Sequence, residues 1–400
     1  MTGKEVRISV DELEIVGVRS LTVELSTGVE ADMFQAGIPN VGGEYTGLFV
    51  RPWEMQQTQA PTPAERKKLF DGQRCEVAIS GEVCFRGFVD DARMEEIPTP
   101  GIEITGRDYT GLLLDEVVSP ALATAVSNVT SSTAVSRIAN AFGLTPKVDR
   151  TTRVWDENQA FAAGTSVWGV VAELAGKEGF DAYVTREKEL VFRKRVMPSV
   201  ISRTIVVPGE NGDSPSERST RGTVPIFPEE LEFYTAKTMA LGLKVRCTGY
   251  DPKANRSIVF TAESPLRNRP NYRVIEVPDR SLRTREQVSA KAWAELLRIS
   301  KGLVTGRYRG PVDGKLRPGQ AIEVRYQKAE GRRQNEEPLE GTYFVTKVKH
   351  QLTQDGEFTT EAEFASKPLA IGTVEVKEVE RETEDKKQYT ISPPGVGAYE

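Results

Sequence analysis

Leu69-Phe-Asp-Gly-Gln-Arg-Cys-Glu-Val77 has a second copy far along the chain, Leu316-Arg-Pro-Gly-Gln-Ala-Ile-Glu-Val324. Both stretches follow the pattern Leu-x-x-Gly-Gln-x-x-Glu-Val. The turns that come next also correspond in order: Gly87 and Gly341, each followed by Phe-Val within a few residues, and then Gly-x-x-x-Thr at 101–105 and 356–360. This order indicates a duplicated, turn-linked β unit whose loops have diverged in length.

The repeat predicts two barrels that superpose. The first lies within 1–118, and the second is built from 229–262 plus 303–370. Gly72 is expected to match Gly319, and Gly87 to match Gly341, at tight turns or close strand approaches. A chain with two similar barrels can build a ring with twice as many pseudo-equivalent units as subunits.

Composition indicates an ordinary soluble protein. Four hundred residues, 38% hydrophobic and 28% charged, fit about two to four domains of ~100–200 residues. The net charge of −5 argues against a dedicated nucleic-acid binder. The start of the chain has no signal-peptide pattern, and no apolar run reaches the ~20 residues of a membrane span. Cys75, Cys84 and Cys247 are expected to be free thiols, since a hairpin would leave Cys75 diagonal to Cys84.

The periodicities and the repeat predict an α+β fold that is mostly β, with two β-barrel domains and a small α+β module; the tube-like form of the barrels is what the resemblance described below implies. Val135, Ile138, Ala139 and Phe142 follow helical spacing, as does the stretch 167–174 after a Ser166 N-cap. Thr284 and Gln287 form a capping box before another helix. The predicted parts are a first barrel at 1–118, the module at 119–200, an exposed linker at 201–228, a second barrel at 229–370 with an inserted segment and helix 284–301, and a C-terminal extension at 371–400.

No catalytic, cofactor-binding or metal site is predicted. His350 is the single histidine, on a strand face shared with Val348 and Leu352, which favours a structural or interface role. Adjacent carboxylates such as Asp90-Asp91 point to opposite faces of a strand and make no dyad by themselves. Glycine-rich phosphate loops with the required Lys-Ser/Thr are absent. Counting carboxylates nevertheless leaves a two-acid glycosidase site open.

Several short motifs, in order, resemble phage late-control protein D and the related tail-hub proteins. The run Gly106-Arg-Asp-Tyr-Thr-Gly-Leu-Leu-Leu-Asp115 is similar to the segment that closes the first barrel in that family. The helix and hairpin of 166–192 resemble the segment that follows. The turn 249–252, Gly-Tyr-Asp-Pro, and the stretches 316–320 and 345–350 are similar to later parts of the family pattern.

The resemblance implies a structural protein, not an enzyme, and no cofactor. It implies a baseplate hub of a contractile phage tail or related injection system, assembled in the bacterial cytoplasm. Three copies would form a pseudo-sixfold ring between a hexameric tail tube and a trimeric spike, with a tape-measure-like protein or DNA passing through. Because the sequence given ends soon after the second barrel, the spike is expected to be a separate polypeptide. A cell-wall hydrolase of the same tail and a monomeric receptor-binding tail protein are the alternatives.

Overall fold

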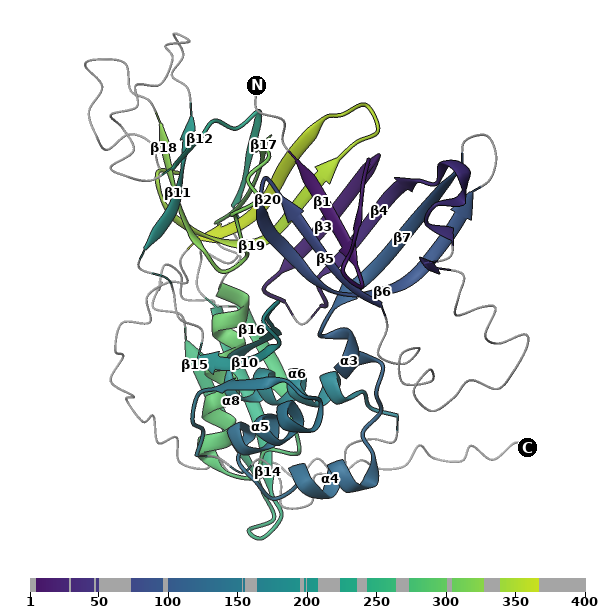
Figure 1. Ribbon diagram of the computed structural model, residues 1–400. Helices are drawn as coiled ribbons and strands as arrows, with labels where there is room; N and C mark the ends of the chain where they lie inside the picture. Colours follow the sequence, from purple (N-terminus) through teal and green to yellow (C-terminus); the bar gives the residue numbers. More distant parts are fainter. Residues whose placement is uncertain are drawn as a thin grey trace, which may run out of the picture.

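The structure is a computed structural model of the 400-residue chain. It describes residues 5–366 apart from positions 29, 47, 50–72, 96–99, 153, 155–163, 195–197, 199, 208–223, 236–242, 264–272, 301–303 and 327–338. The fold is α+β and mostly β, as predicted. Two curled halves of one large sheet lie side by side and form the two barrels. A module of helices and two small sheets lies below them (Figure 1).

The first barrel is half open and antiparallel, in the order β3-β4-β7-β6-β5-β1-β2. Alternate side chains of its strands are buried, so one face of the curled sheet encloses apolar residues. Its elements are β1 (Val6–Val10), β2 (Leu13–Ile15), β3 (Ser20–Ser26), β4 (Met33–Pro39), the short 3-10 helix η1 (Val41–Gly43), β5 (Gln73–Ile79), β6 (Glu82–Glu95) and β7 (Gly101–Asp108). β5 and β6 are the predicted hairpin.

The second barrel repeats this arrangement. Its strands are β11 (Ile201–Val207), β12 (Val224–Ile226), β13 (Glu230–Thr235), β17 (Val304–Pro311), β18 (Ala321–Tyr326), β19 (Gly341–Leu352) and β20 (Phe358–Ser366). The run β13-β17-β20-β19-β18 has the same order and the same antiparallel pairing as β3-β4-β7-β6-β5. The barrels differ beyond this run, because β11 pairs with β18 in parallel where β1 pairs with β5 antiparallel.

A shared irregularity fixes the alignment of the two barrels. The register of β6 on β7 shifts between Val89 and Asp91, and that of β19 on β20 shifts between Val345 and Lys347. A β-bulge of this kind bends a strand and increases its local twist. The bulge therefore occurs at the same place in both units, and it makes Val89 and Val345 equivalent.

The register corrects one predicted equivalence. Gly87 was expected to match Gly341, but its structural counterpart is Tyr343. Gly87 lies opposite Cys75, and Tyr343 lies opposite Ile322, which is the counterpart of Cys75 in the repeat. Gly341 lies two residues earlier, at the start of β19. Gly87 is required locally because a Cβ there would collide with the backbone of β7, a contact that Tyr343 avoids in the second barrel.

Gly72, the other glycine of the predicted matches, lies outside the described residues, so its match with Gly319 stays a prediction. Gly319 itself has a φ of +83° in the turn before β18, which is the left-handed region that favours glycine.

An aromatic ring covers a glycine at equivalent places in the two barrels, but the two residues have exchanged strands. In the first barrel Phe34 of β4 lies opposite Gly106 of β7. In the second, Gly306 of β17 lies opposite Phe364 of β20. Each ring lies where the Cβ of the facing glycine would be. The ring therefore comes from β4 in the first barrel and from β20, the counterpart of β7, in the second. In both barrels the glycine on the facing strand leaves room for the ring, so the two strands keep their close spacing although the sequences differ.

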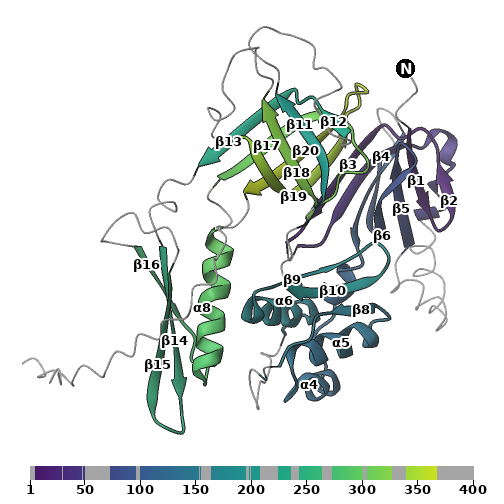
Figure 2. The ribbon, with the colours of Figure 1, turned by 90° about the vertical axis from the view of Figure 1, so that its left-hand side faces the viewer.

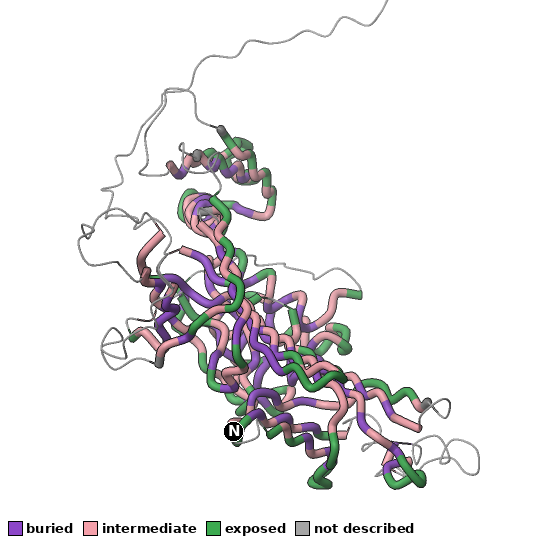
Figure 3. The backbone as a smooth tube through the Cα atoms, turned by 90° about the horizontal axis from the view of Figure 1, so that it is seen from above, coloured by how far each residue is buried: buried purple, intermediate pink, exposed green. Residues whose placement is uncertain are grey.

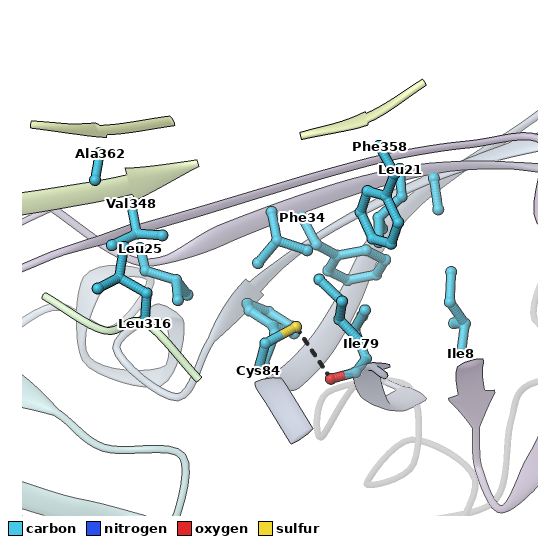
Figure 4. Packing of buried hydrophobic residues seen from close by; sticks show 14 of the residues in the cluster. Ile8, Leu21, Leu25, Phe34, Ile79, Cys84, Leu316, Val348, Phe358 and Ala362 are labelled. Carbon is cyan, nitrogen blue, oxygen red and sulfur yellow. Dashed lines mark hydrogen bonds between the residues drawn. The ribbon is translucent and has the colours of Figure 1, made fainter. Parts of the chain in front are cut away.

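The two barrels are one continuous sheet. β3 of the first barrel pairs antiparallel with the second half of β19, from Leu21 opposite Leu352 to Ser26 opposite Lys347. One hydrophobic core accordingly runs through both barrels. Leu25 of β3 lies beside Val348 on β19, and Leu21 lies further along the strand, beside Phe358 (Figure 4). Buried and exposed residues alternate along the strands, as expected for a sheet packed on one face (Figure 3).

A second core holds the helical module together, and it draws on two distant parts of the chain. The first part comprises α3 (Gly111–Leu114), α4 (Pro120–Val126), α5 (Ser131–Ala141), β8 (Thr145–Val148), α6 (Val167–Glu178), β9 (Phe180–Val184) and β10 (Glu189–Lys194). The second comprises β14 (Leu243–Asp251), β15 (Arg256–Glu263), β16 (Arg273–Pro278) and α8 (Arg285–Ser300). Helices α6 and α8 lie between the two small sheets (Figure 2).

Local signals of the module are confirmed. Ser166 Oγ accepts a hydrogen bond from the Gly169 backbone N–H at 3.0 Å, so it caps α6. Thr284 and Gln287 form the predicted capping box, with the Gln287 N–H donating to Thr284 Oγ1 at 3.2 Å and Gln287 Oε1 accepting from the Thr284 N–H at 3.1 Å. The hairpin of β9 and β10 is also present.

Two predicted boundaries are wrong. Residues 201–228 were expected to be an exposed linker, but 201–207 and 224–226 are strands of the second barrel. Four successive residues of β11, 203–206, are buried, so the strand lacks the two-residue alternation by which it could be recognised. The stretch 243–262 was expected in the second barrel, whereas β14 and β15 form a separate sheet in the module core.

The three cysteines are free and buried, as predicted. Cys84 lies at a bulge, where its thiol donates to the Val77 carbonyl at 3.3 Å (Figure 4). Burial raises the pKa of Cys84 to about 12, so the neutral thiol is the stable form. The predicted C-terminal extension at 371–400 lies outside the described residues.

We expect Gly106→Ala and Gly306→Ala to destabilise the protein. The methyl group added at 106 meets the Phe88 carbonyl oxygen and the Phe34 ring, and the one added at 306 meets the Phe364 ring. Overpacking of this kind typically costs about 1–3 kcal/mol. Thermal unfolding followed by circular dichroism measures the loss.

Gly176→Ala in α6 is the matched control. The nearest atom to its added methyl group is Lys291 Nζ at 3.9 Å, so the change is expected to leave stability equal or about 0.5–1 kcal/mol higher. Equal melting temperatures for all three variants would contradict the close approach of the strands.

Candidate functional site: a mixed-charge face on the continuous sheet

The face of the sheet that points away from the core carries ordered charges. One row of cross-strand neighbours runs through Glu230, Arg309, Glu361, Lys349 and Glu24, on β13, β17, β20, β19 and β3. The sign alternates at every step. Opposite charges directly across a strand pair stabilise the pairing, so this row supports the sheet that displays it.

A second row, two residues along each strand, repeats the alternation with Glu232, Arg307, Glu363 and Lys347. We call the surface formed by the two rows the mixed-charge face. Its charged residues are Glu24, Glu230, Glu232, Arg307, Arg309, Lys347, Lys349, Glu361 and Glu363. Each of β13, β17, β19 and β20 therefore carries one sign of charge, and its neighbours carry the other.

Glu24 ties the face together across the joint between the barrels. Its carboxylate pairs with Lys347 Nζ at 2.8 Å and with Lys349 Nζ at 3.6 Å. The hydrogen bond from Lys347 is the main cause of the lowered pKa of Glu24, and the same bond raises the pKa of Lys347. All three side chains are half exposed, so the contribution to stability is small, about 0.2–1 kcal/mol.

A hollow of about 270 Å³ lies on this face. Residues of the mixed-charge face form most of its wall, with Gln351, Thr353 and Thr359 beside them. The lining is polar throughout. Arg307 Nη1 lies 3.4 Å from Glu361 within it, so an acid that could attack a substrate is held in an ion pair.

The Gly106–Asp115 motif forms the corner where the first barrel joins the module. Arg107 Nε and Nη2 donate to the Asp90 carboxylate at 2.7 and 2.9 Å. Its Nη1 and Nη2 donate to Asp115, at the end of α3, at 2.9 and 2.8 Å. One guanidinium thus connects a barrel strand to the first helix of the module. The hydrogen bond to Asp90 and then that to Asp115 raise the pKa of Arg107 further.

Asp108, which is buried, and Asp32, which is half-buried, lie at the same corner. Asp108 accepts hydrogen bonds from the Thr110 N–H at 3.1 Å and hydroxyl at 2.9 Å, and its own N–H donates to the Asp32 carbonyl at 3.0 Å. Burial raises the pKa of Asp32 to about 7, and burial together with the Asp32 charge raises that of Asp108. Separated pKa values can mark a catalytic acid, but these groups lie inside the corner and not in a cleft.

His350 lies in the joint between the barrels, opposite Val23 of β3, and it is fully buried. Its Nδ1 hydrogen-bonds the Thr360 hydroxyl at 2.9 Å, and its Nε2 has no partner in the described part of the chain. Burial, with a smaller contribution from the Arg317 charge, lowers the pKa of His350 to about 3. The structural or interface role predicted from the sequence stays a prediction.

The described residues contain no group of three or more His, Cys, Asp or Glu side chains that could hold a metal ion. Within the same residues, no helix is long and apolar enough to cross a membrane. Of the adjacent carboxylates weighed in the sequence, Asp90 is paired with Arg107, and 336–337 lie outside the described residues.

Sequence reasoning missed the mixed-charge face, although a local signal exists. Like charges recur two residues apart at Glu230 and Glu232, at 307 and 309, at 347 and 349, and at 361 and 363. On a strand this spacing places both charges on one face. Only the pairing order, which brings acidic strands next to basic ones, turns these separate pairs into one surface.

The fold is that of solved phage tail proteins. The tail protein from Neisseria meningitidis MC58 aligns with a TM-score of 0.65 at 14% identity, over 92% of this chain and 98% of that chain. The 43 kDa tail protein of prophage MuSo2 from Shewanella oneidensis aligns with a TM-score of 0.59 at 15% identity, over 91% and 98%. The prophage tail protein from Listeria monocytogenes EGD-e gives 0.50 at 13%, over 92% and 96%.

These likenesses confirm the predicted resemblance at the level of the fold. They extend over nearly the whole length of both chains, so the barrels and the module are shared together. No protein-family model matches the chain. No curated protein matches its sequence either.

The mixed-charge face is expected not to bind DNA, because its acidic strands offset its basic ones. The wild-type protein should leave duplex DNA unshifted in a gel assay at about 150 mM salt. Glu361→Lys with Glu363→Lys makes β17, β20 and β19 basic, and this variant should bind DNA with an affinity that falls steeply with salt. Strong binding by the wild type, or none by the variant, would contradict the expectation.

The depressed pKa of His350 predicts a specific pH dependence. In the unfolded protein the histidine has a pKa near 6.5 and becomes protonated below that pH, whereas in the folded protein it stays neutral. The contribution of His350 to the free energy of unfolding is therefore fully present above pH 6.5 and is lost as the pH falls. The slope approaches about 1.4 kcal/mol per pH unit.

Melting temperatures of the wild type and His350→Gln between pH 7 and 5 measure this effect. The difference between the two proteins should shrink as the pH falls, because only the wild type loses stability through this group. A constant difference across the range would show that the pKa of His350 is the same in the folded and the unfolded protein.

Proposed function

We propose that the chain is the structural hub of a contractile phage tail or of a related injection apparatus. Three copies form a ring of six pseudo-equivalent barrels. The ring joins a hexameric tail tube on one side to a trimeric spike on the other. The tail-protein fold supports the general assignment to such a particle, and the architecture of the chain supports the hub role.

The observation that carries this proposal is the repeated strand order. One chain contains two barrels with the same five-strand antiparallel run and the same bulge. A sixfold tube and a threefold spike can meet on a protein that presents six similar units in three copies. Three copies of a chain with a single barrel would present only three such units, which match the threefold spike but not the sixfold tube.

The mixed-charge face fits the wall of the central passage. It is polar, continuous across the joint between barrels, and balanced in sign along its rows. A strongly basic wall would hold DNA by its phosphates and slow its exit. The balanced face lets DNA or a tape-measure-like protein slide past without a fixed binding site.

The hub role is structural and not catalytic. Cell-wall hydrolysis would use two carboxylates set apart in pKa on either side of a substrate cleft. The hollow on the sheet is lined by paired charges, and Asp32 and Asp108 lie in the buried corner. A monomeric receptor-binding protein gives no reason for two matching barrels in one chain. The location in the particle follows from the hub role.

The purified chain is expected to be a trimer. Light scattering after size-exclusion chromatography should give three times the mass of the chain, and negative-stain images should show a ring. A monomer at micromolar concentration would contradict the proposal.

The same preparation tests the alternatives. Incubation with purified peptidoglycan should release no soluble fragments. If fragments are released and the substitution of one acidic residue abolishes the release, the hydrolase is favoured. A compact monomer that binds a cell-surface receptor would favour the receptor-binding tail protein.

A further inference from the structure

Three turns, one from each part of the fold, meet at a single backbone carbonyl. The hairpin of β5 and β6 in the first barrel carries Val83 beside its turn. Arg186, in the turn between β9 and β10 of the module, donates to the Val83 carbonyl through Nη1. Arg317, in the turn before β18 of the second barrel, donates to the same oxygen through Nη2 at 2.8 Å. Because two donors to one acceptor lie within about 6 Å of each other, the two guanidinium groups are neighbours.

Further close contacts fix the backbone around this carbonyl. Lys315 Nζ of the second barrel pairs with Glu82 of the first barrel at 3.0 Å. A Cβ at Gly314 would lie 2.6 Å from the Ile79 carbonyl oxygen, so the two turns are in direct contact. Leu316 is fully buried in the core that the barrels share. The turn that carries Arg317 is therefore held firmly against the first barrel.

The charges at this place, which we call the arginine junction, do not balance. It consists of the three turns 79–83, 185–188 and 312–320. Its charged residues are four basic and three acidic: Arg186, Lys188, Lys315 and Arg317, with Glu82, Glu187 and Asp313. Asp313 is already paired with Arg203 of β11 at 2.5 Å, so the excess of positive charge is larger than the count alone indicates.

Arg317 is the arginine of the junction that lacks a carboxylate. Arg186 pairs with the acidic residue that follows it at 2.7 Å. Within the described part of the chain, Arg317 instead donates to two carbonyl oxygens, those of Leu316 at 2.7 Å and of Val83 at 2.8 Å. Burial lowers the pKa of Arg317, and the Arg186 charge contributes in the same direction. The two cations are thus held together without a negative charge between them.

We propose that the arginine junction binds a small oxyanion of the phosphate class between Arg186 and Arg317. A guanidinium binds such anions through paired N–H groups, and each arginine has N–H groups that its described contacts do not use. Arg186 is exposed and Arg317 is half-buried, so an ion can reach the pair from solvent while protein encloses one side of it.

The bound anion would connect all three parts of the fold. It would contact the module through Arg186 and the second barrel through Arg317, and both arginines contact the first barrel at Val83. Neutralisation of the excess charge would remove the repulsion between the arginines and hold the module against the barrels. The site goes beyond the hub role, and a chain in any oligomeric state can be tested for it.

Inorganic phosphate is the probe for this site. Equilibrium dialysis of the full chain with radiolabelled phosphate should show saturable binding at constant ionic strength. The melting temperature should also rise with the logarithm of the phosphate concentration once the site is half filled. Phosphate stabilises many proteins through exclusion from their surfaces, so the binding measurement on variants decides the question.

Arg186→Gln and Arg317→Gln should each weaken phosphate binding about tenfold or more, because each removes charge-assisted hydrogen bonds. Arg317→Lys, which keeps the charge but loses the paired N–H groups, should bind with intermediate affinity. Arg298→Gln is the matched control, since Arg298 is an exposed arginine paired with Glu295 on α8, and it should bind phosphate as the wild type does.

Circular dichroism checks that each variant is folded. Arg186 is exposed, so its variant supplies the test if Arg317→Gln fails to fold. The absence of saturable binding to the wild type would overturn the proposal. Equal dissociation constants for the wild type and Arg186→Gln would also overturn it, because the anion would then not lie between the two arginines.

Discussion

The antiparallel pairing of β3 with β19 is the contact on which the rest of the structure depends. It turns two barrels into one sheet with one core, and it places the ordered charges of both on a single surface. Leu21, Val23 and Leu25 supply the buried side of this joint, and Glu24 with two lysines supplies the exposed side. Separation of the strands would open an edge on each barrel and cut the core in two.

The helical module depends on the barrels in a different way. Its core combines 109–192 with 245–296, and these segments flank the stretch that contributes β11, β12 and β13 to the second barrel. The chain thus passes from the module into the second barrel, back to the module, and into the second barrel again. Arg107 adds a direct tie from the first barrel to α3. Crossing connections of this kind tie the module to both barrels.

Sequence patterns predicted the parts of this fold that are decided locally. The Ser166 cap, the Thr284–Gln287 capping box and the hairpins depend on residues within a few positions of each other. β11 was missed because burial on both faces removes the alternation. The stretch 243–262 was placed in the wrong core, because the alternation of a strand shows only that one face is buried and not which core covers that face. The mixed-charge face was missed because strand order, not sequence, brings its charges together.

The joint between the barrels also imposes an order on synthesis. Thr27, just after β3, hydrogen-bonds Thr346, which is 319 residues further along the chain. At about 5–20 residues per second, a ribosome needs roughly 16–60 s to make that stretch. During this time β3 has one bare edge, and the apolar side chains of the first barrel that face the joint lack their cover. Until β19 emerges, this open edge can pair with a strand of another chain, and a stall within the second barrel would leave the edge uncovered.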